Sequence, residues 1–131
     1  MDFDSPAKLI EGIERYFGRD LGSWLACFDA PYAFVTADTT MVADDEDAAR
    51  RQFAPAFKGL QAAGFASSIA DNITTRFVGT DLALVDARFT RWHRDGTSMG
   101  ATAALYVCRR HEVGWRIAAV IQHPPGDDAL P

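Results

Sequence analysis

Apolar residues in the first half of the chain recur at helical spacing. Ser5 and Pro6 open the first helix, because serine caps helix starts and proline fits the first helical position. The apolar positions that follow lie three and four residues apart, at Leu9, Ile10, Ile13, Tyr16 and Phe17. This pattern predicts a helix that ends near Gly18.

Two further helices are predicted in this half. Asp20 can cap a short second helix, which Pro31 should end. The acidic residues at 44–47 favour the start of a third helix, because a helix N-terminus stabilises negative charge. Gly64 closes this helix, and Pro55 should kink or divide it because proline lacks the backbone donor.

Strand patterns occupy the rest of the chain. Residues 32–44 are rich in β-branched and aromatic residues and predict a strand or short hairpin with a turn near Asp38. Beyond Gly64 the apolar period changes to two, and four strands are expected, at 66–78, 82–94, 98–109 and 115–123. The separators between them are short, so consecutive strands should pair antiparallel.

Helices followed by such a meander predict the α+β class, with the N-terminal helices packed into a strongly curved antiparallel sheet. The chain has 131 residues, of which 48% are hydrophobic, and this suits one domain. We expect that domain to span residues 1–123, followed by a short C-terminal tail at 124–131.

Charge and cysteine content narrow the function classes. The formal net charge of -5 argues against nucleic-acid binding, which needs a clustered basic face. The sequence shows no signal peptide, and no apolar run approaches the ~18 residues of a membrane span, so we expect a cytoplasmic protein without a membrane partner. Cys27 and Cys108 are expected to be buried free thiols, and the histidine and cysteine spacing predicts no metal site and no cofactor.

Two short segments carry a resemblance to a known family. One is Asp20, Leu21 and Phe28, and the other is Gly114, Trp115 and Ile117 near the C-terminus. Through these segments the chain resembles the nuclear transport factor 2-like superfamily, in its SnoaL-like and ketosteroid-isomerase-like branch. The resemblance implies a cystatin-like cone with one open mouth, and a homodimer formed through the outer sheet face.

The same resemblance suggests site residues. Tyr16 matches the tyrosine that donates to the oxyanion in ketosteroid isomerases, and Tyr106 falls near the second acid of that oxyanion hole. The proton-abstracting aspartate of those enzymes falls at Thr36, and threonine cannot serve as that base. Steroid-isomerase chemistry is therefore not expected.

The strand at 82–94 carries Asp86 and Arg88 inside an apolar run. If the last strand faces inward as in ketosteroid isomerases, then Ile117, Ile121 and His123 point into the cone. Matching the 82–94 strand in the same way places Asp86, Arg88 and Trp92 there too. With the opposite facing, the apolar residues between them form the core, and Asp86 and Arg88 form an exposed or interfacial ion pair.

Asp86 and His123 are the candidate catalytic pair, because a carboxylate can orient an imidazole and raise its basicity. The candidate ligand-binding residues are Arg88, Trp92, Tyr16, Tyr106, Ile117 and Ile121. The first hypothesis is a pocket for a small, partly apolar organic ligand, with cofactor-free acid/base chemistry such as isomerisation, cyclisation, dehydration or hydrolysis. The alternatives are a non-catalytic ligand-binding or dimeric accessory domain, and a structural interaction protein whose cone is filled by side chains.

Overall fold

The computed structural model describes residues 3–125, and its helices begin at side-chain caps. The Ser5 hydroxyl accepts a hydrogen bond from the Lys8 amide at the start of α1 (Pro6–Tyr16). Asp20 and Asp45 cap α2 (Leu21–Leu25) and α3 (Glu46–Ala62) in the same way. Each cap satisfies a backbone donor that the first helical turn leaves free.

The prediction at Pro31 is wrong, and of the two outcomes expected at Pro55 the division of the helix does not occur. The second helix ends at Leu25, before Pro31, and Pro31 lies inside the first strand. Pro55 does not divide α3, which continues as one helix through it. Pro55 lies on the exposed side of α3, where water can reach the carbonyl group that the missing donor leaves unpaired.

Six strands form one curved, open sheet. They are β1 (Phe28–Val35), β2 (Thr40–Ala43), β3 (Phe65–Val78), β4 (Leu82–His93), β5 (Ser98–His111) and β6 (Gly114–His123). Their order across the sheet is β2-β1-β6-β5-β4-β3, and among the strands of residues 3–125 only β1 and β6 pair in parallel. The four-stranded antiparallel meander and the α+β class predicted from the sequence are confirmed.

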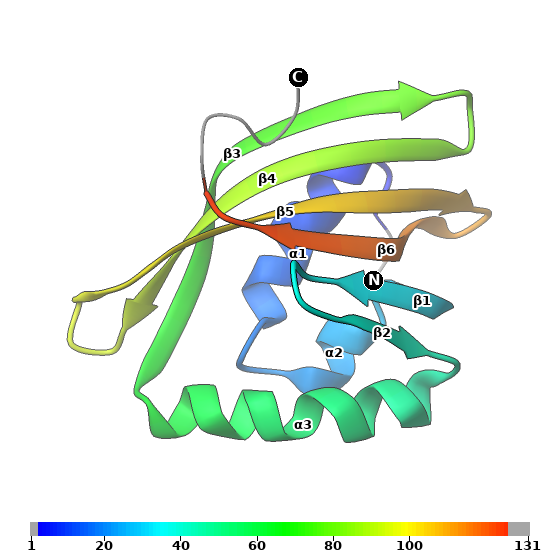
Figure 1. Cartoon of the computed structure of the whole chain (residues 1–131). Helices are drawn as coiled ribbons and strands as arrows, with labels where there is room; N and C mark the ends of the chain where they lie inside the picture. Colours follow the sequence, from blue (N-terminus) through cyan, green and yellow to red (C-terminus); the bar gives the residue numbers. More distant parts are fainter. Residues whose placement is uncertain (1–2, 126–131) are drawn as a thin grey trace.

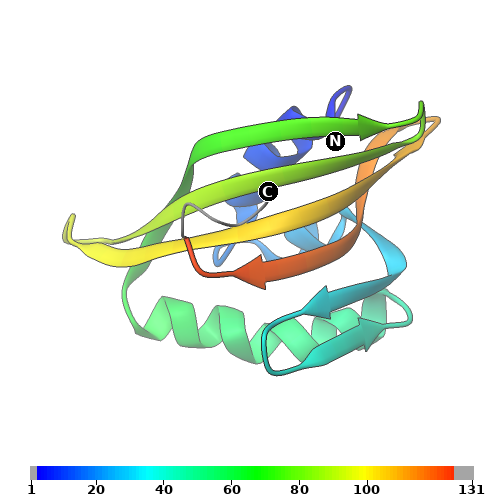
Figure 2. The ribbon, with the colours of Figure 1, turned by 45° about the horizontal axis from the view of Figure 1, so that its top comes forward.

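The helices lie on the concave side of this sheet. α1 packs under β3 and β4, and α3 runs across the lower edge of the fold beneath α2 and β2 (Figure 1). The long strands β3, β4 and β5 arch over the helices, as the turned view shows (Figure 2). The concave face is therefore covered by helices along most of its length, and the convex face is not.

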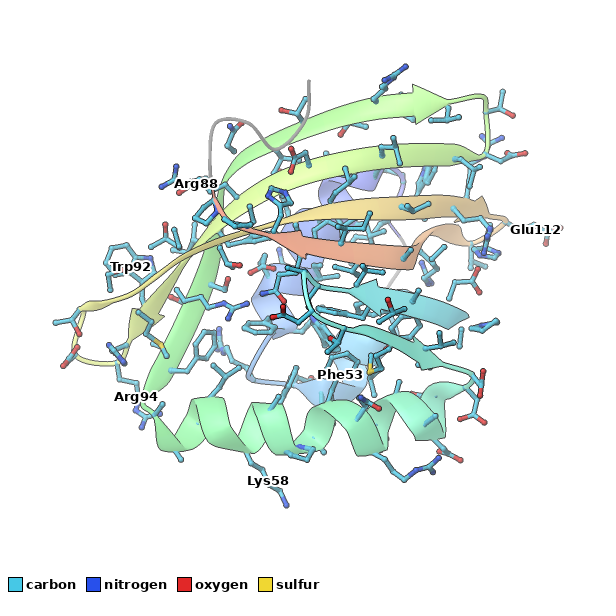
Figure 3. All side chains as sticks on the ribbon, viewed as in Figure 1. Phe53, Lys58, Arg88, Trp92, Arg94 and Glu112 are labelled. Atoms are coloured by element: carbon cyan, nitrogen blue, oxygen red, sulfur yellow. The ribbon has the colours of Figure 1, made fainter. Side chains whose placement is uncertain are left out.

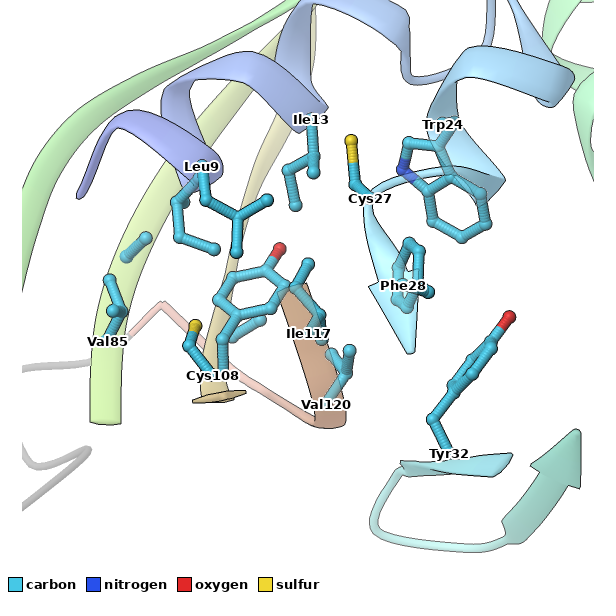
Figure 4. Close-up of a cluster of buried hydrophobic side chains, with 14 of the residues drawn as sticks. Leu9, Ile13, Trp24, Cys27, Phe28, Tyr32, Val85, Cys108, Ile117 and Val120 are labelled. Atoms are coloured by element: carbon cyan, nitrogen blue, oxygen red, sulfur yellow. The ribbon is translucent and has the colours of Figure 1, made fainter. Parts of the chain in front are cut away.

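The main core lies between α1, α2 and the concave face. Within residues 3–125, side chains from three helices and five strands meet there, among them Leu9, Trp24, Val85 and Ile117 (Figure 4). Cys27 and Cys108 belong to the same cluster, both are buried, and they form no disulfide within residues 3–125. Burial raises the pKa of Cys27 to about 11 and that of Cys108 to about 12, so both thiols stay protonated at neutral pH.

The side chains of β4 that face the core are the opposite set from the one that the pocket hypothesis places there. Ala83, Val85, Ala87 and Phe89 are at most 2% exposed and form part of the core. Asp86 and Arg88 occupy the alternate positions and therefore lie on the convex face, where Arg88 projects away from the helices (Figure 3). Small apolar side chains fit under α1, and this fit decides which face is inside.

A β-bulge changes the facing of β6 part-way along the strand. Cys108 of β5 pairs with Ile117, but the preceding Val107 pairs with Ala119, so Ala118 is an extra residue. Ile117 points into the core as predicted, whereas beyond the bulge Val120 points inward and Ile121 is exposed. The predicted inward facing of Ile121 and His123 is therefore wrong, because a strict period of two cannot pass through a bulge.

Candidate functional site

A cavity opens on the concave face between the helices and β1, β4, β5 and β6. Its volume is about 410 Å³ when the mouth is included. Nearly half of its lining residues are aromatic, namely Phe17, Trp24, Phe28, Phe34, Phe89 and Tyr106. Its polar groups belong to Glu14, Arg91, Thr102 and Gln122.

The aromatic wall is held in place by ring-to-ring contacts. Trp24 of α2 packs against Phe28, with ring centroids 4.6 Å apart, and against Phe53 of α3 at 4.9 Å. Figure 3 shows Phe53 on the side of α3 that faces the rest of the fold. Tilted and edge-on packing of this kind fixes ring orientation, so the cavity keeps a defined shape.

Glu14 is the buried acid of this site. It lies in α1 with only 8% of its surface exposed. Burial raises the pKa of Glu14 from 4.5 to about 7, and the Ser68 hydroxyl and the Arg91 charge oppose that rise. The Ser68 hydroxyl lies beside the carboxyl group, but it has no hydrogen bond of normal geometry within residues 3–125.

Arg91 is the cation of the site and comes from the inward face of β4. Its guanidinium group lies over the Phe17 ring, 4.4 Å from the ring centroid. Burial lowers the pKa of Arg91 from its ordinary value, and the nearby Glu14 counteracts this. Arginine stays protonated even so, and its buried Nε–H has no hydrogen-bond partner among the described residues.

Tyr106 completes the polar group from β5. Its ring meets Phe89 edge-on, with centroids 6.2 Å apart. Burial raises the pKa of Tyr106 well above its ordinary value, and the negative charge of Glu14 adds to the rise. The hydroxyl therefore remains a proton donor at neutral pH. Of the ligand-binding residues predicted from the sequence, Tyr106 is the one that lines this cavity.

The structure does bring Asp86 and His123 together, but on the convex face. His123 Nε2 lies 3.2 Å from Asp86 Oδ1, and the side chains are 19% and 24% exposed. His123 Nδ1 lies 2.8 Å from the carbonyl oxygen of Pro124. Their predicted place inside the cone is wrong, because Ala87 and its neighbours take the inward positions. A catalytic role for the pair stays a prediction and would concern the outer surface.

The other predicted residues lie outside the cavity. Arg88 does not pair with Asp86; its Nε is 4.0 Å from a carboxylate oxygen of Asp71 on β3. Trp92 lies near the β4–β5 hairpin, on the outer side of the sheet (Figure 3). Tyr16 packs against the core from the end of α1, and Ile117 is fully buried within it.

Glu14 and Arg91 were missed by reasoning from the sequence, although each had a signal. Glu14 falls within the apolar stripe of the first helix, four residues after Ile10 and three before Phe17. Arg91 falls two residues beyond Phe89, at the next position of the alternation that starts at Ala83. A charged residue inside a buried stripe is expensive to bury and therefore marks a candidate site.

Comparison with known proteins identifies the family. The sequence matches the family described as NTF2-like protein (DUF6841) over residues 8–125. The chain belongs to this NTF2-like family. No curated protein matches the sequence.

Solved structures share the fold of this NTF2-like protein. A protein of unknown function with a cystatin-like fold from Nostoc punctiforme is 16% identical with a TM-score of 0.72, covering 100% of this chain and 98% of its own. An NTF2-like protein from Novosphingobium aromaticivorans is 18% identical with a TM-score of 0.73, covering 93% and 80%. An NTF2-like superfamily protein from Salmonella enterica is 16% identical with a TM-score of 0.63, covering 94% and 90%. At these identities the likeness shows the fold alone.

Two further observations concern metals and membranes. Within residues 3–125 no group of three or more histidine, cysteine, aspartate or glutamate side chains is placed to hold a metal ion. No helix in the same range is long and apolar enough to cross a membrane.

Proposed function

We propose that the NTF2-like cavity binds a small, partly apolar organic molecule and that Glu14 exchanges a proton with it. The observation that carries this proposal is a buried carboxyl group with a pKa of about 7 in an aromatic-lined cavity. A general acid or base works best when its pKa lies near the operating pH. Clefts with mainly apolar walls and a few convergent polar groups are typical ligand sites.

The neighbouring groups have separate roles in this proposal. Arg91 and the Tyr106 hydroxyl can stabilise negative charge on a ligand oxygen, because both donate hydrogen bonds in a site of low dielectric. Gln122 and Thr102 offer uncharged polar contacts for orientation. This set supports cofactor-free isomerisation, cyclisation, dehydration or hydrolysis, since each reaction needs a group that both gives and takes a proton.

Proton exchange with solvent deuterium tests the proposal directly. The protein is incubated in D₂O with a panel of small carbonyl compounds, including neutral ketones and 2-oxo acids, and loss of the α-proton signal is followed by NMR. We expect catalysed exchange for at least one compound, with a decrease of at least about 100-fold in Glu14→Gln. The glutamine keeps the size of the side chain but cannot act as a base.

Asp86→Asn is the matched control for this experiment, because it changes a carboxylate on the other face of the sheet. Exchange that survives in Glu14→Gln but disappears in Asp86→Asn would contradict the proposal and restore the outer pair as the catalytic one. Binding without exchange of any compound would favour a non-catalytic ligand-binding domain. The observation that favours this second function is Thr36, which stands at the position of the proton-abstracting aspartate of ketosteroid isomerases and cannot act as that base.

We also propose that the convex face of the sheet forms a homodimer contact. This face is not covered by the helices and carries exposed apolar side chains on three strands, namely Ile69, Val78, Leu82 and Ile121. Asp86, Arg88 and His123 share the face. A contact of this kind would bury apolar area and would leave the mouth of the cavity on the opposite side free.

A further inference from the structure

We infer that the ligand of the cavity is a small monocarboxylate, held through its carboxylate by Arg91. This inference rests on the proposed function and adds the chemical class of the ligand. It starts from Arg91, which lines the cavity and whose buried Nε–H has no hydrogen-bond partner among the described residues. A buried donor without a partner is costly, and it leaves the Arg91 guanidinium group with an unused capacity to donate. An anion in the cavity that accepts from this guanidinium group is therefore favoured.

The charge balance of the cavity favours an anion. Arg91 keeps its positive charge, whereas the carboxyl group of Glu14 is neutral in a large part of the molecules at neutral pH. In that state the guanidinium group is not neutralised by Glu14. A carboxylate supplies the missing negative charge, and the planar arginine fork matches its two oxygens.

The groups that face Glu14 come from each neighbouring strand. Ser68 lies on β3, Arg91 on β4 and Tyr106 on β5, and of these Arg91 alone is charged at neutral pH. From β6 the cavity receives Gln122, which does not titrate. The net charge of the pocket near neutral pH therefore depends on whether Glu14 is ionised. Ionised Glu14 would repel a bound carboxylate.

The size and walls of the cavity limit the rest of the ligand. The cavity volume of about 410 Å³ includes the open mouth, so the enclosed part suits a small monocarboxylate of about three to five carbons. The remaining wall is largely aromatic and favours an apolar chain. A phosphate would bring two charges to a single cation and would place polar oxygens against these rings, so it fits less well.

Butyrate and its neutral isostere butyramide test this inference. Each is titrated into the ¹⁵N-labelled protein at about pH 6, and the indole N–H of Trp24 and the amides of β5 are followed by NMR. We expect butyrate to bind at least about tenfold more tightly than butyramide, because its bond to Arg91 is charge-assisted. In Arg91→Gln this preference should disappear.

The pH dependence in the unaltered protein gives a second readout that does not require a variant. Butyrate binding should weaken by about tenfold between about pH 6 and pH 8 as Glu14 ionises, and Glu14→Gln should not show this change. Butyramide binding should stay constant over the same range.

The outcomes separate the inference from the proposed function. Equal affinities for butyrate and butyramide would overturn the carboxylate class and leave a cavity for neutral molecules. Shifts confined to residues away from the cavity would overturn the inference as well. If neither compound moves the Trp24 or β5 signals, both the inference and the small-molecule proposal lose their support.

Discussion

Two acid/base pairs lie on opposite faces of the same sheet, and they differ in surroundings more than in composition. On the concave face Glu14 lies near Arg91 among aromatic rings. On the convex face Asp86 lies 3.2 Å from His123, in a setting that the helices leave open. Each site therefore combines one carboxylate with one basic side chain.

The difference between the two sites shows how burial changes the pKa of a carboxyl group. At the inner site, desolvation is the largest influence on the carboxyl group and raises the pKa of Glu14 to about 7. At the outer site the side chains remain about one fifth to one quarter exposed and contact each other directly. Burial thus distinguishes the two sites more clearly than the distance between their acid and their base does.

Of the substitutions that distinguish the two sites, Glu14→Gln should have the largest effect, and this effect is on the pH dependence of the free energy of unfolding. The pKa of Glu14 is about 7 in the folded protein and 4.5 in the reference state, so between these values the folded protein keeps a proton that the unfolded chain has lost. The free energy of unfolding should therefore fall as the pH rises through this window, by about 3 kcal/mol from this group. The Glu14→Gln variant should not show this decrease in the free energy of unfolding, because glutamine does not ionise.

Urea unfolding of both proteins at about pH 4.5 and about pH 8 measures the effect. At the lower pH the two proteins should be similar in stability, and at the higher pH the variant should be the more stable one. An identical pH dependence in both proteins would mean that Glu14 is not buried as described.

Replacing Ile121 by glutamate should have the next largest effect, through the proposed dimer. In a two-fold symmetric contact the new charges face like charges or an apolar surface, so the dimer dissociation constant should rise by at least about tenfold. Sedimentation equilibrium measures this constant.

Val113→Glu is the control for the dimer prediction. Val113 is also exposed but lies in the β5–β6 turn rather than on the sheet face. We expect it to leave the dissociation constant unchanged. A monomeric unaltered protein, or equal weakening by both variants, would refute the outer-face dimer.

Replacing Asp86 by asparagine should have the smallest effect. Partly exposed ion pairs contribute about 0 to 1 kcal/mol, so the free energy of unfolding should change by less than about 1 kcal/mol. Thermal unfolding measures it, with Asp71→Asn as a matched control on the same face. A loss of more than about 2 kcal/mol would show that the outer pair behaves like a buried one.

Much of the fold could be predicted from the sequence, because local patterns determine it. The period of two beyond Gly64 predicted the four strands of the meander within a few residues, and helix caps such as Ser5 marked where helices begin. These signals act within a few residues of the position they describe.

The site could not be predicted in the same way, because facing depends on the other elements. Ala87 and Asp86 alternate along β4, and the fit of small side chains under α1 decides which of them is inside. Glu14 has no partner close in sequence, since Ser68 and Arg91 come from strands that are distant along the chain. Only the assembled sheet brings these three residues together.

The extra residue Ala118 determines on which face of the sheet the following side chains of β6 lie. With the bulge, Val120 and Gln122 line the cavity, while Ile121 and the histidine at 123 belong to the other surface. Loss or gain of one residue at this point would move Ile121 and His123 to the cavity side and Val120 and Gln122 to the outer surface, without any substitution. Relatives with the same fold can therefore place an imidazole or an amide in the cavity by a change in length, and alignments that ignore this residue compare opposite surfaces.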